Sequence, residues 1–387
     1  MAIAFVAFLA GDRLSGNFAE KGRADVTSGE RLDLSAIVFD RTSGKLEARD
    51  LKARLQARLM QLTHLALAPI GYLGVSRVHA AINKAIRPTS DTLILESGVR
   101  FSFPSNDYYW NRLLDANWQY EPEIDAFLRA ASAVPFVFLD LGANFGYWSA
   151  RVGSGLYGSH RSIAVEASAT SFAILECNAR ALPQPVTVYH RAIDAVSGKK
   201  VVLYGERHAG FSLNHNWHGG SGNKVNEVET ISIDDLLAAE NIDASRTPVL
   251  IKLDVEGVEA RALAGAARTI RGQAALIIED AERNDVSEAV RRLHLDLGMS
   301  LFRFDRGSFR EIECLDEIKS LKARQSSLQS VGLNLVAASS PVWKSVIRQQ
   351  PVDGPGGKQS SQILADDLGA SAINASGRSG VSPGMAD

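Results

Sequence analysis

An acidic segment late in the chain carries residue types that proton transfer requires. It reads Lys-Leu-Asp-Val-Glu-Gly-Val-Glu from Lys252 to Glu259. Lys252 and Asp254 alternate with a leucine on a predicted strand and therefore share one face. Three carboxylates within six residues are costly to cluster unless they bind a cation, a metal or hydroxyl groups. We interpret Asp254, Glu256 and Glu259 as candidate site residues, although the helix dipole alone also favours a carboxylate at the helix start, where Glu259 lies.

A glycine-containing turn earlier in the chain is the second candidate site. It begins Asp140-Leu-Gly-Ala-Asn-Phe-Gly and follows a predicted strand. A ligand that crosses the carboxyl ends of parallel strands needs close backbone approach, which Gly142 and Gly146 allow. A nicotinamide fingerprint would read Gly-x-Gly-x-x-Gly, but Asn144 stands at its second glycine. Asp140 suits a cationic ligand; the alternative is an ordinary tight strand-to-helix turn.

Three more acidic residues follow predicted strands. Glu166 ends the second strand, where a carboxylate can accept both hydrogens of a ribose diol. Asp194 follows the third strand and is either a candidate for the edge of an adenine ring or a plain turn residue. Glu279 ends the fifth strand and extends the wall of the acidic pocket. Asp254 and Glu279 are the candidate pair if a divalent metal binds.

A loop rich in histidine lies between the third and fourth strands. It contains His208, His215, His218 and Trp217. Histidine titrates near neutral pH, and tryptophan can stack on a ring-shaped ligand. A substrate lid, an inert surface loop and a metal site are all compatible with this pattern.

The elements that must position these residues follow from short apolar runs separated by amphipathic segments. Five runs predict buried strands, at 136–140, 162–166, 186–190, 249–254 and 275–279. Their alternation with helical stretches predicts a parallel sheet with helices on both faces. The runs at 300–304 and 332–337 add an antiparallel pair at the edge, which gives a seven-stranded, mostly parallel α/β sheet.

Three parts of the chain are expected. Residues 1–90 form an N-terminal extension, loop-rich over 11–50 and then helical, with leucines from Leu55 to Leu67 at helical spacing. The helix is interpreted as a cap on the sheet or as a membrane-surface helix. Residues 91–345 form the main domain, which opens with a hairpin around Gly98 and a helix starting Glu121-Pro-Glu. The Gly-, Ser- and Pro-rich residues 346–387 are predicted to be a disordered tail.

Composition narrows the class of protein. The 387 residues are 45% hydrophobic and 22% charged, with a net charge of −2, which does not favour a nucleic-acid surface. Cys177 and Cys314 have no metal-ligand spacing, and a reducing compartment fits two cysteines. The apolar N-terminus lacks a preceding basic residue and is about half the length of a membrane span. We therefore predict a cytoplasmic protein without a membrane span; the sequence does not indicate its oligomeric state.

These motifs together resemble the FkbM family of S-adenosylmethionine-dependent methyltransferases. The family pattern Asp-x-Gly-Ala-Asn-x-Gly, followed by aromatic and small hydroxyl residues, is matched at 140–149, and Lys-x-Asp-x-Glu-Gly-x-Glu is complete at 252–259. The threonine-led segment at 230–237 is similar to the family's Thr-x-x-Asp-x-Leu. The acidic ribose position and the residues that follow it are matched by Glu166, Phe172, Leu175 and Asn178. A proline commonly follows the ribose acid, whereas Ala167 stands here; the resemblance covers residues 91–338.

The resemblance implies a Rossmann-like class I methyltransferase fold and methyl transfer from S-adenosylmethionine. The expected acceptor is a hydroxyl group of a small molecule, sugar, glycan or natural product, with N-methylation and metal dependence left open. Asp254 is expected to act as base or metal ligand, Lys252 to orient or stabilise the developing oxyanion, and Glu256 and Glu259 to bind sugar hydroxyls or shape the turn. The residues expected to hold the cofactor are Asp140, Gly142, Asn144, Gly146, Glu166 and Asp194. A non-catalytic binding protein and a nicotinamide-dependent oxidoreductase are the alternatives.

Overall fold

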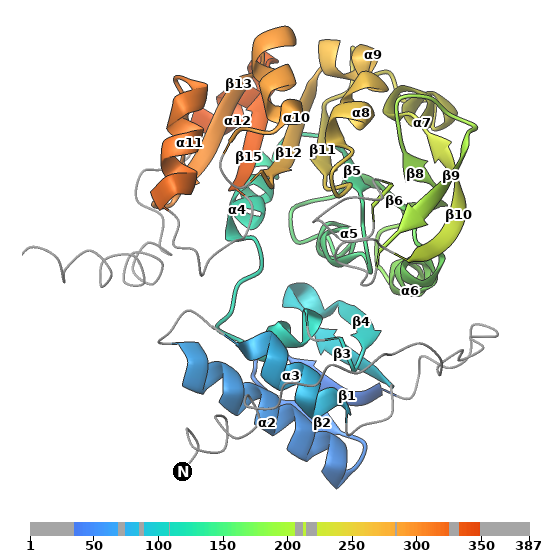
Figure 1. Ribbon diagram of the computed structural model, residues 1–387, viewed down its shortest axis with the longest axis vertical. Coiled ribbons are helices and arrows are strands. Elements are labelled where there is room, and N and C mark those ends of the chain that lie inside the picture. The colour runs from blue at the N-terminus through green and yellow to red at the C-terminus, as the bar shows by residue number, and fades with distance from the viewer. Residues whose placement is uncertain are drawn as a thin grey trace, which may run out of the picture.

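The computed structural model describes residues 35–68, 74–84, 89–107, 109–205, 212–213, 223–282, 285–324 and 333–348. These residues form a smaller N-terminal lobe and a larger lobe built on a long sheet (Figure 1). The four aromatic and histidine residues of the histidine-rich loop and residues 349–387 of the predicted tail lie outside the described residues, whereas residues 346–348, predicted to be disordered, end a helix that begins at Pro341.

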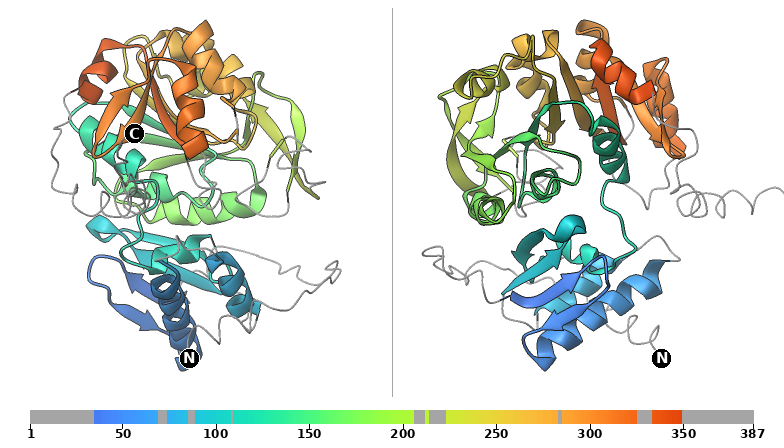
Figure 2. Two further views of the ribbon diagram at one scale, coloured as in Figure 1. Left: turned by 60° about the vertical axis from the view of Figure 1, so that its left-hand side comes forward. Right: turned by 180° about the vertical axis from the view of Figure 1, so that it is seen from behind.

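The N-terminal lobe is a four-stranded sheet with two helices. Its elements are β1 (Ser35–Asp40), β2 (Leu46–Ala48), α2 (Leu51–Leu67), α3 (Val75–Lys84), β3 (Ser90–Ile94) and β4 (Arg100–Pro104). The strand order is β2-β1-β3-β4, with β1 parallel to β3 and the other pairs antiparallel. Helix α2 packs against β1, β2 and α3. Figure 2 shows the two helices on the side of this sheet away from the larger lobe.

This lobe differs in part from the expectation. The hairpin around Gly98 is confirmed, because β3 and β4 pair antiparallel across it. The segment expected to be loop-rich contains β1 and β2 instead. The sheet also joins strands on both sides of residue 90, the expected domain boundary. We therefore propose that the N-terminal unit includes β3 and β4 and that the larger lobe begins after them.

The larger lobe contains an eight-stranded sheet with helices on both faces. Its strands are β5 (Val137–Leu141), β6 (Arg161–Glu166), β7 (Val186–His190), β11 (Val249–Leu253), β12 (Ala274–Asp280), β13 (Ser300–Asp305), β14 (Ser308–Glu311) and β15 (Leu333–Ala338). The order is β14-β13-β15-β12-β11-β5-β6-β7. Five neighbouring strands are parallel, namely β12, β11, β5, β6 and β7. Strand β15 lies between β12 and β13 and runs antiparallel to both. The predicted Rossmann-like fold is confirmed, with one strand more than expected because β13 turns back into β14.

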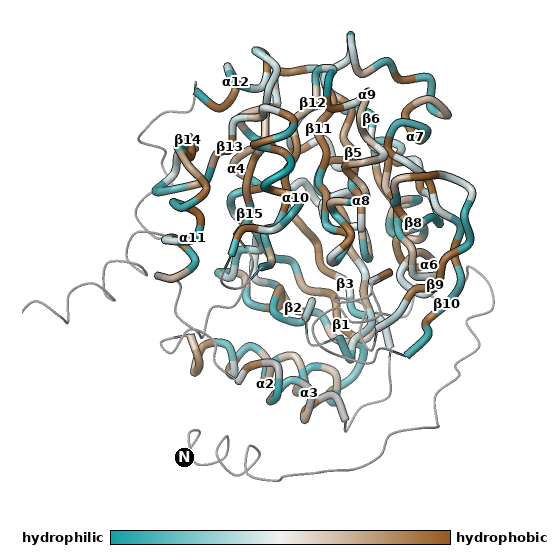
Figure 3. Tube along the Cα trace, turned by 45° about the horizontal axis from the view of Figure 1, so that its top comes forward, coloured by the Kyte–Doolittle hydropathy of each residue, from teal (hydrophilic) through white to brown (hydrophobic). Residues whose placement is uncertain are grey.

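Side chains alternate between the two faces of this sheet, and each face has its own core. One face packs against α4 (Pro122–Ala131), α5 (Tyr147–Gly153) and α12 (Pro341–Arg348). The other packs against α7 (Ile233–Ala239), α8 (Glu259–Ala264), α9 (Ala267–Arg271), α10 (Glu288–Arg291) and α11 (Leu315–Arg324). Every residue of β5 and β11 is buried, as expected for a parallel sheet covered on both sides. Figure 3 shows these central strands as largely hydrophobic.

Two smaller features complete the fold. A three-stranded sheet of β8 (Ala192–Ile193), β10 (Lys224–Ile231) and β9 (Lys200–Tyr204) follows β7. Helix α6 (Ala169–Arg180) joins the lobes through Asn178, whose amide accepts a hydrogen bond from the Ser102 backbone N–H at 2.9 Å and donates to the Ser102 carbonyl at 2.9 Å. Asn178 also donates to the Phe145 carbonyl at 2.8 Å, so it links β4 to the glycine-containing turn. None of the described helices has the length and apolar character needed to cross a membrane.

Candidate active site

A cavity of about 420 Å³ lies at the carboxyl ends of the parallel strands. This volume is within the range of small-molecule and cofactor sites. Residues 109–123, the glycine-containing turn, the end of β6, the acidic segment after β11, Glu279 and Asn334 contribute to its lining. The two motifs that are far apart in sequence therefore meet in one cavity.

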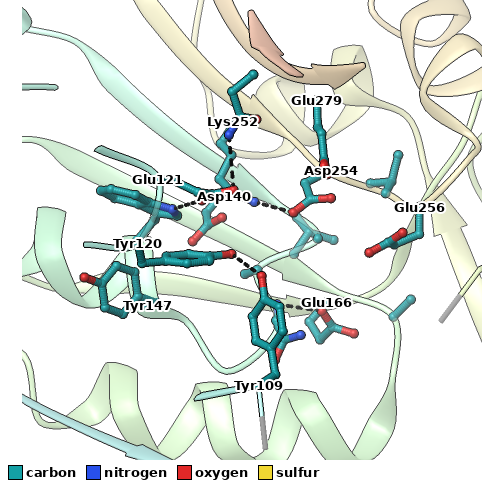
Figure 4. A pocket seen from close by; sticks show the side chains of 18 of the residues that line it. Tyr109, Tyr120, Glu121, Asp140, Tyr147, Glu166, Lys252, Asp254, Glu256 and Glu279 are labelled. Atoms are coloured by element: carbon teal, nitrogen blue, oxygen red, sulfur yellow. Dashed lines mark hydrogen bonds and ion pairs between the residues drawn. The ribbon is translucent and has the colours of Figure 1, made fainter. Parts of the chain in front are cut away.

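The strand register explains why these side chains converge. Asp140 and Lys252 are register partners on adjacent strands β5 and β11. Each lies two residues after a side chain of the core that packs on α4 and α5, so both point to that face. Glu166 ends β6, and Glu279 lies near the end of β12. The carboxyl ends of the parallel strands thus carry one lysine among several carboxylates (Figure 4).

Asp140 is almost completely buried, with 1% of its surface exposed. One of its carboxylate oxygens, Oδ2, accepts hydrogen bonds from the Ser149 backbone N–H at 3.0 Å and from the Ser149 hydroxyl at 2.6 Å. The other, Oδ1, is buried without a hydrogen-bond partner among the described residues. Burial raises the pKa of Asp140, while Lys252 and Ser149 oppose the rise. The site therefore has a buried acceptor oxygen available to a cationic donor.

The glycine-containing turn packs directly against the acidic segment. Gly142 has φ = 80°, and a Cβ there would lie 1.8 Å from the Asp254 carbonyl oxygen. Gly146 has φ = 84°, and its Cβ would lie 2.5 Å from Leu175 Cδ1. A side chain at either position would therefore force the two segments or the neighbouring helix apart. The glycines bring chain segments together here, in addition to the ligand approach predicted for them.

Glu166 and Asn144 hold the two strand-end turns in place. Glu166 accepts hydrogen bonds from the Asn144 backbone N–H and from the Ser168 backbone N–H, both at 2.8 Å. Asn144 lies in the left-handed region with φ = 53°, and its side-chain oxygen accepts from the Phe145 backbone N–H at 2.8 Å. Both residues line the cavity, as predicted.

Lys252 forms an ion pair with Asp254 inside the site. Its Nζ donates to Asp254 Oδ2 at 2.8 Å, and Lys252 is buried while Asp254 remains partly exposed to the cavity. Burial alone would lower the pKa of Lys252, but Asp254, Glu121 and Asp140 outweigh it and raise the pKa. Lys252 therefore stays charged and fixes the orientation of Asp254.

Glu121 is a site residue that the sequence marked only as the start of helix α4. Its backbone is left-handed, with φ = 45°, and its Oε2 accepts a hydrogen bond from Trp148 Nε1 at 2.6 Å. Burial raises the pKa of Glu121 to about 7; Asp254 adds to the rise and Lys252 opposes it. A carboxylate with a pKa near neutrality is suited to proton exchange.

An aromatic wall stands next to Glu121. The hydroxyls of Tyr109 and Tyr120 are hydrogen-bonded at 3.0 Å, and Trp118 also lines the cavity. Burial raises the pKa of both tyrosines, so both remain protonated. In the sequence, only the aromatic composition of residues 109–120 pointed to this wall. The predicted order of the strands gives no reason to place the segment at the carboxyl ends of the strands.

Three predicted residues, Gly146, Asp194 and Glu259, are not part of the cavity lining. Asp194 lies outside its lining and pairs with Arg261, with Arg261 Nε 3.0 Å from Asp194 Oδ1. Glu259 also lies outside the lining, and its Oε1 accepts from the Gly257 backbone N–H at 3.0 Å. Glu259 thus stabilises its own turn, and Asp194 behaves as the turn residue that was the alternative for it.

Glu256 and Glu279 line the cavity as predicted. Glu256 adopts φ = 50°, and its carbonyl accepts a hydrogen bond from the Ser212 hydroxyl at 2.5 Å. Among the described residues, no group of three or more His, Cys, Asp or Glu side chains has an arrangement that could hold a metal ion. The pairing of Asp254 with Glu279 as metal ligands therefore gains no support.

The sheet order defines a Rossmann-like α/β domain, and the cavity lies at the carboxyl ends of its parallel strands. Residues 140–301 match the family model described as Methyltransferase FkbM domain, which confirms the resemblance seen in the motifs. The match covers the glycine-containing turn and the acidic segment, and it ends in β13.

Three solved structures with partial similarity are described as methyltransferases. The methyltransferase FkbM from Methylobacillus flagellatus is 16% identical with a TM-score of 0.34, over 54% of this chain and 45% of that chain. The precorrin-6y C5,15-methyltransferase from Geobacter metallireducens is 12% identical with a TM-score of 0.32, over 58% of this chain and 90% of that one. A putative S-adenosylmethionine-dependent methyltransferase from Listeria monocytogenes is 9% identical with a TM-score of 0.26, over 56% of this chain and 100% of that one. The match spans less than half the length of the first structure. No curated protein matches the chain significantly.

Proposed function

We propose that this chain is an S-adenosylmethionine-dependent methyltransferase that methylates a hydroxyl group of a sugar, glycan or natural product. The observation that carries the proposal is the buried Asp140 Oδ1, which has no partner among the described residues and lies beside the Lys252–Asp254 ion pair. A cation-accepting oxygen and a lysine-held carboxylate in one cavity are what a cationic methyl donor and a hydroxyl acceptor require.

The residues present fit S-adenosylmethionine. Asp140 would accept from its ammonium group, because a buried acceptor without a partner is costly until a donor arrives. Glu166 lines the cavity and would accept from the ribose hydroxyls, since a carboxylate oxygen can accept more than one hydrogen bond. When bound, the cofactor supplies an electrophilic methyl group on a sulfonium centre. Asp194 is left out of this set because of its pairing with Arg261.

Asp254 is proposed to take the proton from the acceptor hydroxyl. A hydroxyl is a weak nucleophile, and a positioned base typically contributes 10²–10⁴-fold to such a reaction. Lys252 holds Asp254 at 2.8 Å and stabilises negative charge that develops on the acceptor oxygen. In Figure 4, Glu121 lies on the side of Lys252 opposite to Asp254. It is the second carboxylate that can exchange a proton near pH 7.

The aromatic wall supports a ring-shaped acceptor. Tyr109, Trp118 and Tyr120 present apolar faces with polar edges, which suits a sugar or a cyclic natural product. Glu256 and Glu279 line the same cavity and can accept hydrogen bonds from acceptor hydroxyls. The proposal therefore places the cofactor along β5 and β6 and the acceptor between the acidic segment and the aromatic wall.

Calorimetry with S-adenosylmethionine tests the cofactor half of the proposal. Asp140→Asn should weaken binding by about 30- to 150-fold, because a charge-assisted hydrogen bond contributes roughly 2–3 kcal/mol. Asp194→Asn is the matched control, because its carboxylate is also buried at a strand-end turn but lies outside the cavity; it should leave the affinity unchanged. No binding to the wild-type chain, tighter binding of NAD, or equal losses in the two variants would each count against the proposal.

Transfer of a labelled methyl group tests the reaction. The labelled cofactor is incubated with a panel of glycosides, other hydroxyl-bearing natural products and amines. Product formed only from hydroxyl acceptors supports O-methylation, whereas product formed only from amines contradicts it. Tight cofactor binding without transfer to any acceptor would favour the non-catalytic binding protein.

A further inference from the structure

Helix α2 turns its largest apolar side chains toward solvent. Leu51, Leu55, Leu62 and Leu65 are 80%, 67%, 60% and 73% exposed. They are four of the six exposed large hydrophobic residues in the described part of the chain. Their spacing places them along one face of the helix. Scattered exposed leucines are ordinary, but a stripe of them along one helix marks an interaction surface.

The buried face of α2 shows the reverse of the usual arrangement. It carries mainly small and polar residues, namely Ala53, Gln56, Ala57, Met60, Thr63 and His64. The small residues allow α2 to lie close to β1 and β2. The outward leucines are therefore not displaced core residues of this lobe, because their positions on the inner face are already filled.

The exposed face of α2 is also basic. Lys52, Arg54 and Arg58 are exposed, and α2 contains no Asp or Glu. None of these three side chains forms an ion pair with another described residue. Leucines and cations on one exposed face can both contact an anionic lipid surface, because the leucines enter the apolar boundary while the long basic side chains extend to the phosphates.

We propose that the chain docks on an anionic phospholipid surface through the exposed face of α2, with the helix lying in the plane of that surface. The leucines enter the boundary between headgroups and acyl chains, and the three basic side chains contact lipid phosphates. The occupant is chosen by charge complementarity. A second copy of the chain would place two sets of unpaired cations against each other, which is unfavourable. The proposal stands independently of the methyltransferase activity.

Helix α2 contacts the segment that forms the aromatic wall of the cavity. Gln61 of α2 donates to the Leu114 carbonyl at 2.9 Å, and Arg41 donates to the Asp115 carbonyl at 2.9 Å. Leu114 ends the short helix η3 (Trp110–Leu114), which also supplies Trp110 and Arg112 to the cavity. A membrane-bound α2 thus lies one element away from the site.

Vesicle flotation with the full chain tests the proposal. The probes are vesicles of phosphatidylcholine alone and vesicles of equal parts phosphatidylcholine and phosphatidylglycerol. The wild-type chain should float with the anionic vesicles, more weakly at high salt, and not with phosphatidylcholine alone. Leu55→Ser/Leu62→Ser should weaken binding about tenfold or more. Arg54→Gln and Arg58→Gln should weaken it about fivefold each.

Matched controls come from exposed residues elsewhere. Leu295→Ser and Arg246→Gln change side chains that are as exposed as those on α2, and both should bind like the wild type. Circular dichroism and thermal melting of each variant verify that the fold is retained. The proposal fails if the wild-type chain ignores anionic vesicles or if Leu55→Ser/Leu62→Ser binds normally. It also fails if light scattering shows an oligomer that this double variant dissociates, because a second copy then covers the leucines.

Discussion

Each lobe buries an aspartate inside a sheet, and the two aspartates differ in their surroundings. Asp140 on β5 has Ser149 on one oxygen and Lys252 on the neighbouring strand. Asp91 on β3 is equally buried, and neither of its oxygens has a hydrogen-bond partner among the described residues. Burial raises the pKa of Asp91 to about 7, and the nearby Ile37 amide opposes the rise only in part.

The two aspartates differ in whether burial of the carboxylate is offset by neighbouring charges. In the larger lobe the buried charges compensate one another, and one acceptor oxygen is left for a ligand. In the N-terminal lobe, burial shifts the pKa of Asp91 and of His79 in the direction that favours the neutral form. His79, stacked on His64 with ring centroids 5.0 Å apart, shows the same tendency, because burial first and His64 second lower its pKa to about 3. The structure gives no physical reason for retaining Asp91.

The largest expected effect is in the cavity of the larger lobe. Asp254→Asn should lower the rate of methyl transfer about 10²–10⁴-fold, because the base is lost. The affinity for the cofactor should change little, since an asparagine can still accept the hydrogen bond from Lys252, whereas the free energy of unfolding should fall because buried Lys252 loses its main charge partner. Steady-state kinetics on an acceptor found by labelled methyl transfer would measure it. Unchanged turnover would transfer the role of base to Glu121, for which Glu121→Gln is the next variant.

Asp91→Asn should have the opposite profile, with no effect on turnover and a gain in stability. The folded-state pKa of about 7 lies well above the ordinary value of an aspartate, so between the two values the folded chain holds a proton that the unfolded chain has released. Stability therefore falls as pH rises from about 4 to about 7, and the variant removes that loss. The gain should be absent at pH 4 and reach up to about 4 kcal/mol at pH 8.

Urea unfolding at the two pH values measures this gain. Asp243→Asn, an exposed aspartate, serves as the control. Glu121 also has a pKa raised to about 7, so part of the pH dependence should survive in Asp91→Asn. A variant that is less stable than the wild type at pH 8 would show that Asp91 has a partner and would remove the contrast with Asp140.

The smallest expected effect concerns the junction between the lobes. Asn178→Ala removes three hydrogen bonds to Ser102 and Phe145 and should cost about 2–3 kcal/mol, because buried backbone groups are left unsatisfied. Hydrogen exchange should increase in β4 and in the glycine-containing turn, with less change in the far strands of the larger sheet. Asn117→Ala, an exposed substitution, should change neither. Uniform destabilisation without a local increase would mean that Asn178 does not couple the lobes.

The parallel strands were the best-predicted part of the fold. All five lie within one residue of their predicted ends, because buried parallel strands produce continuous apolar runs. The edge pair was also predicted, while the short hairpin strand β14 has no such run. The N-terminal strands were missed because β2 has only three residues and the apolar run of β1 stands alone in a segment rich in Gly, Asp, Arg and Ser.

The leucine pattern of α2 shows the limit of periodicity. The spacing predicted the helix, but spacing alone does not say whether the apolar stripe faces inward. Small residues on the other face, and the sheet that packs on them, decided this. The site shows the same limit, since Glu121 and the aromatic wall come from a segment whose position depends on the N-terminal lobe.

The sequence by itself determined the class of the domain and most of its polar site. Motif spacing places Asp140, Glu166, Lys252 and Asp254 at strand ends, and parallel strands in one sheet align those ends at a common edge. Only the tertiary structure decided which acids face the cavity. Asp194 and Glu259 also lie at such ends, but Arg261 and the Gly257 backbone N–H bind them elsewhere. Side-chain partners across the fold depend on distances between segments, which local patterns in the sequence do not encode.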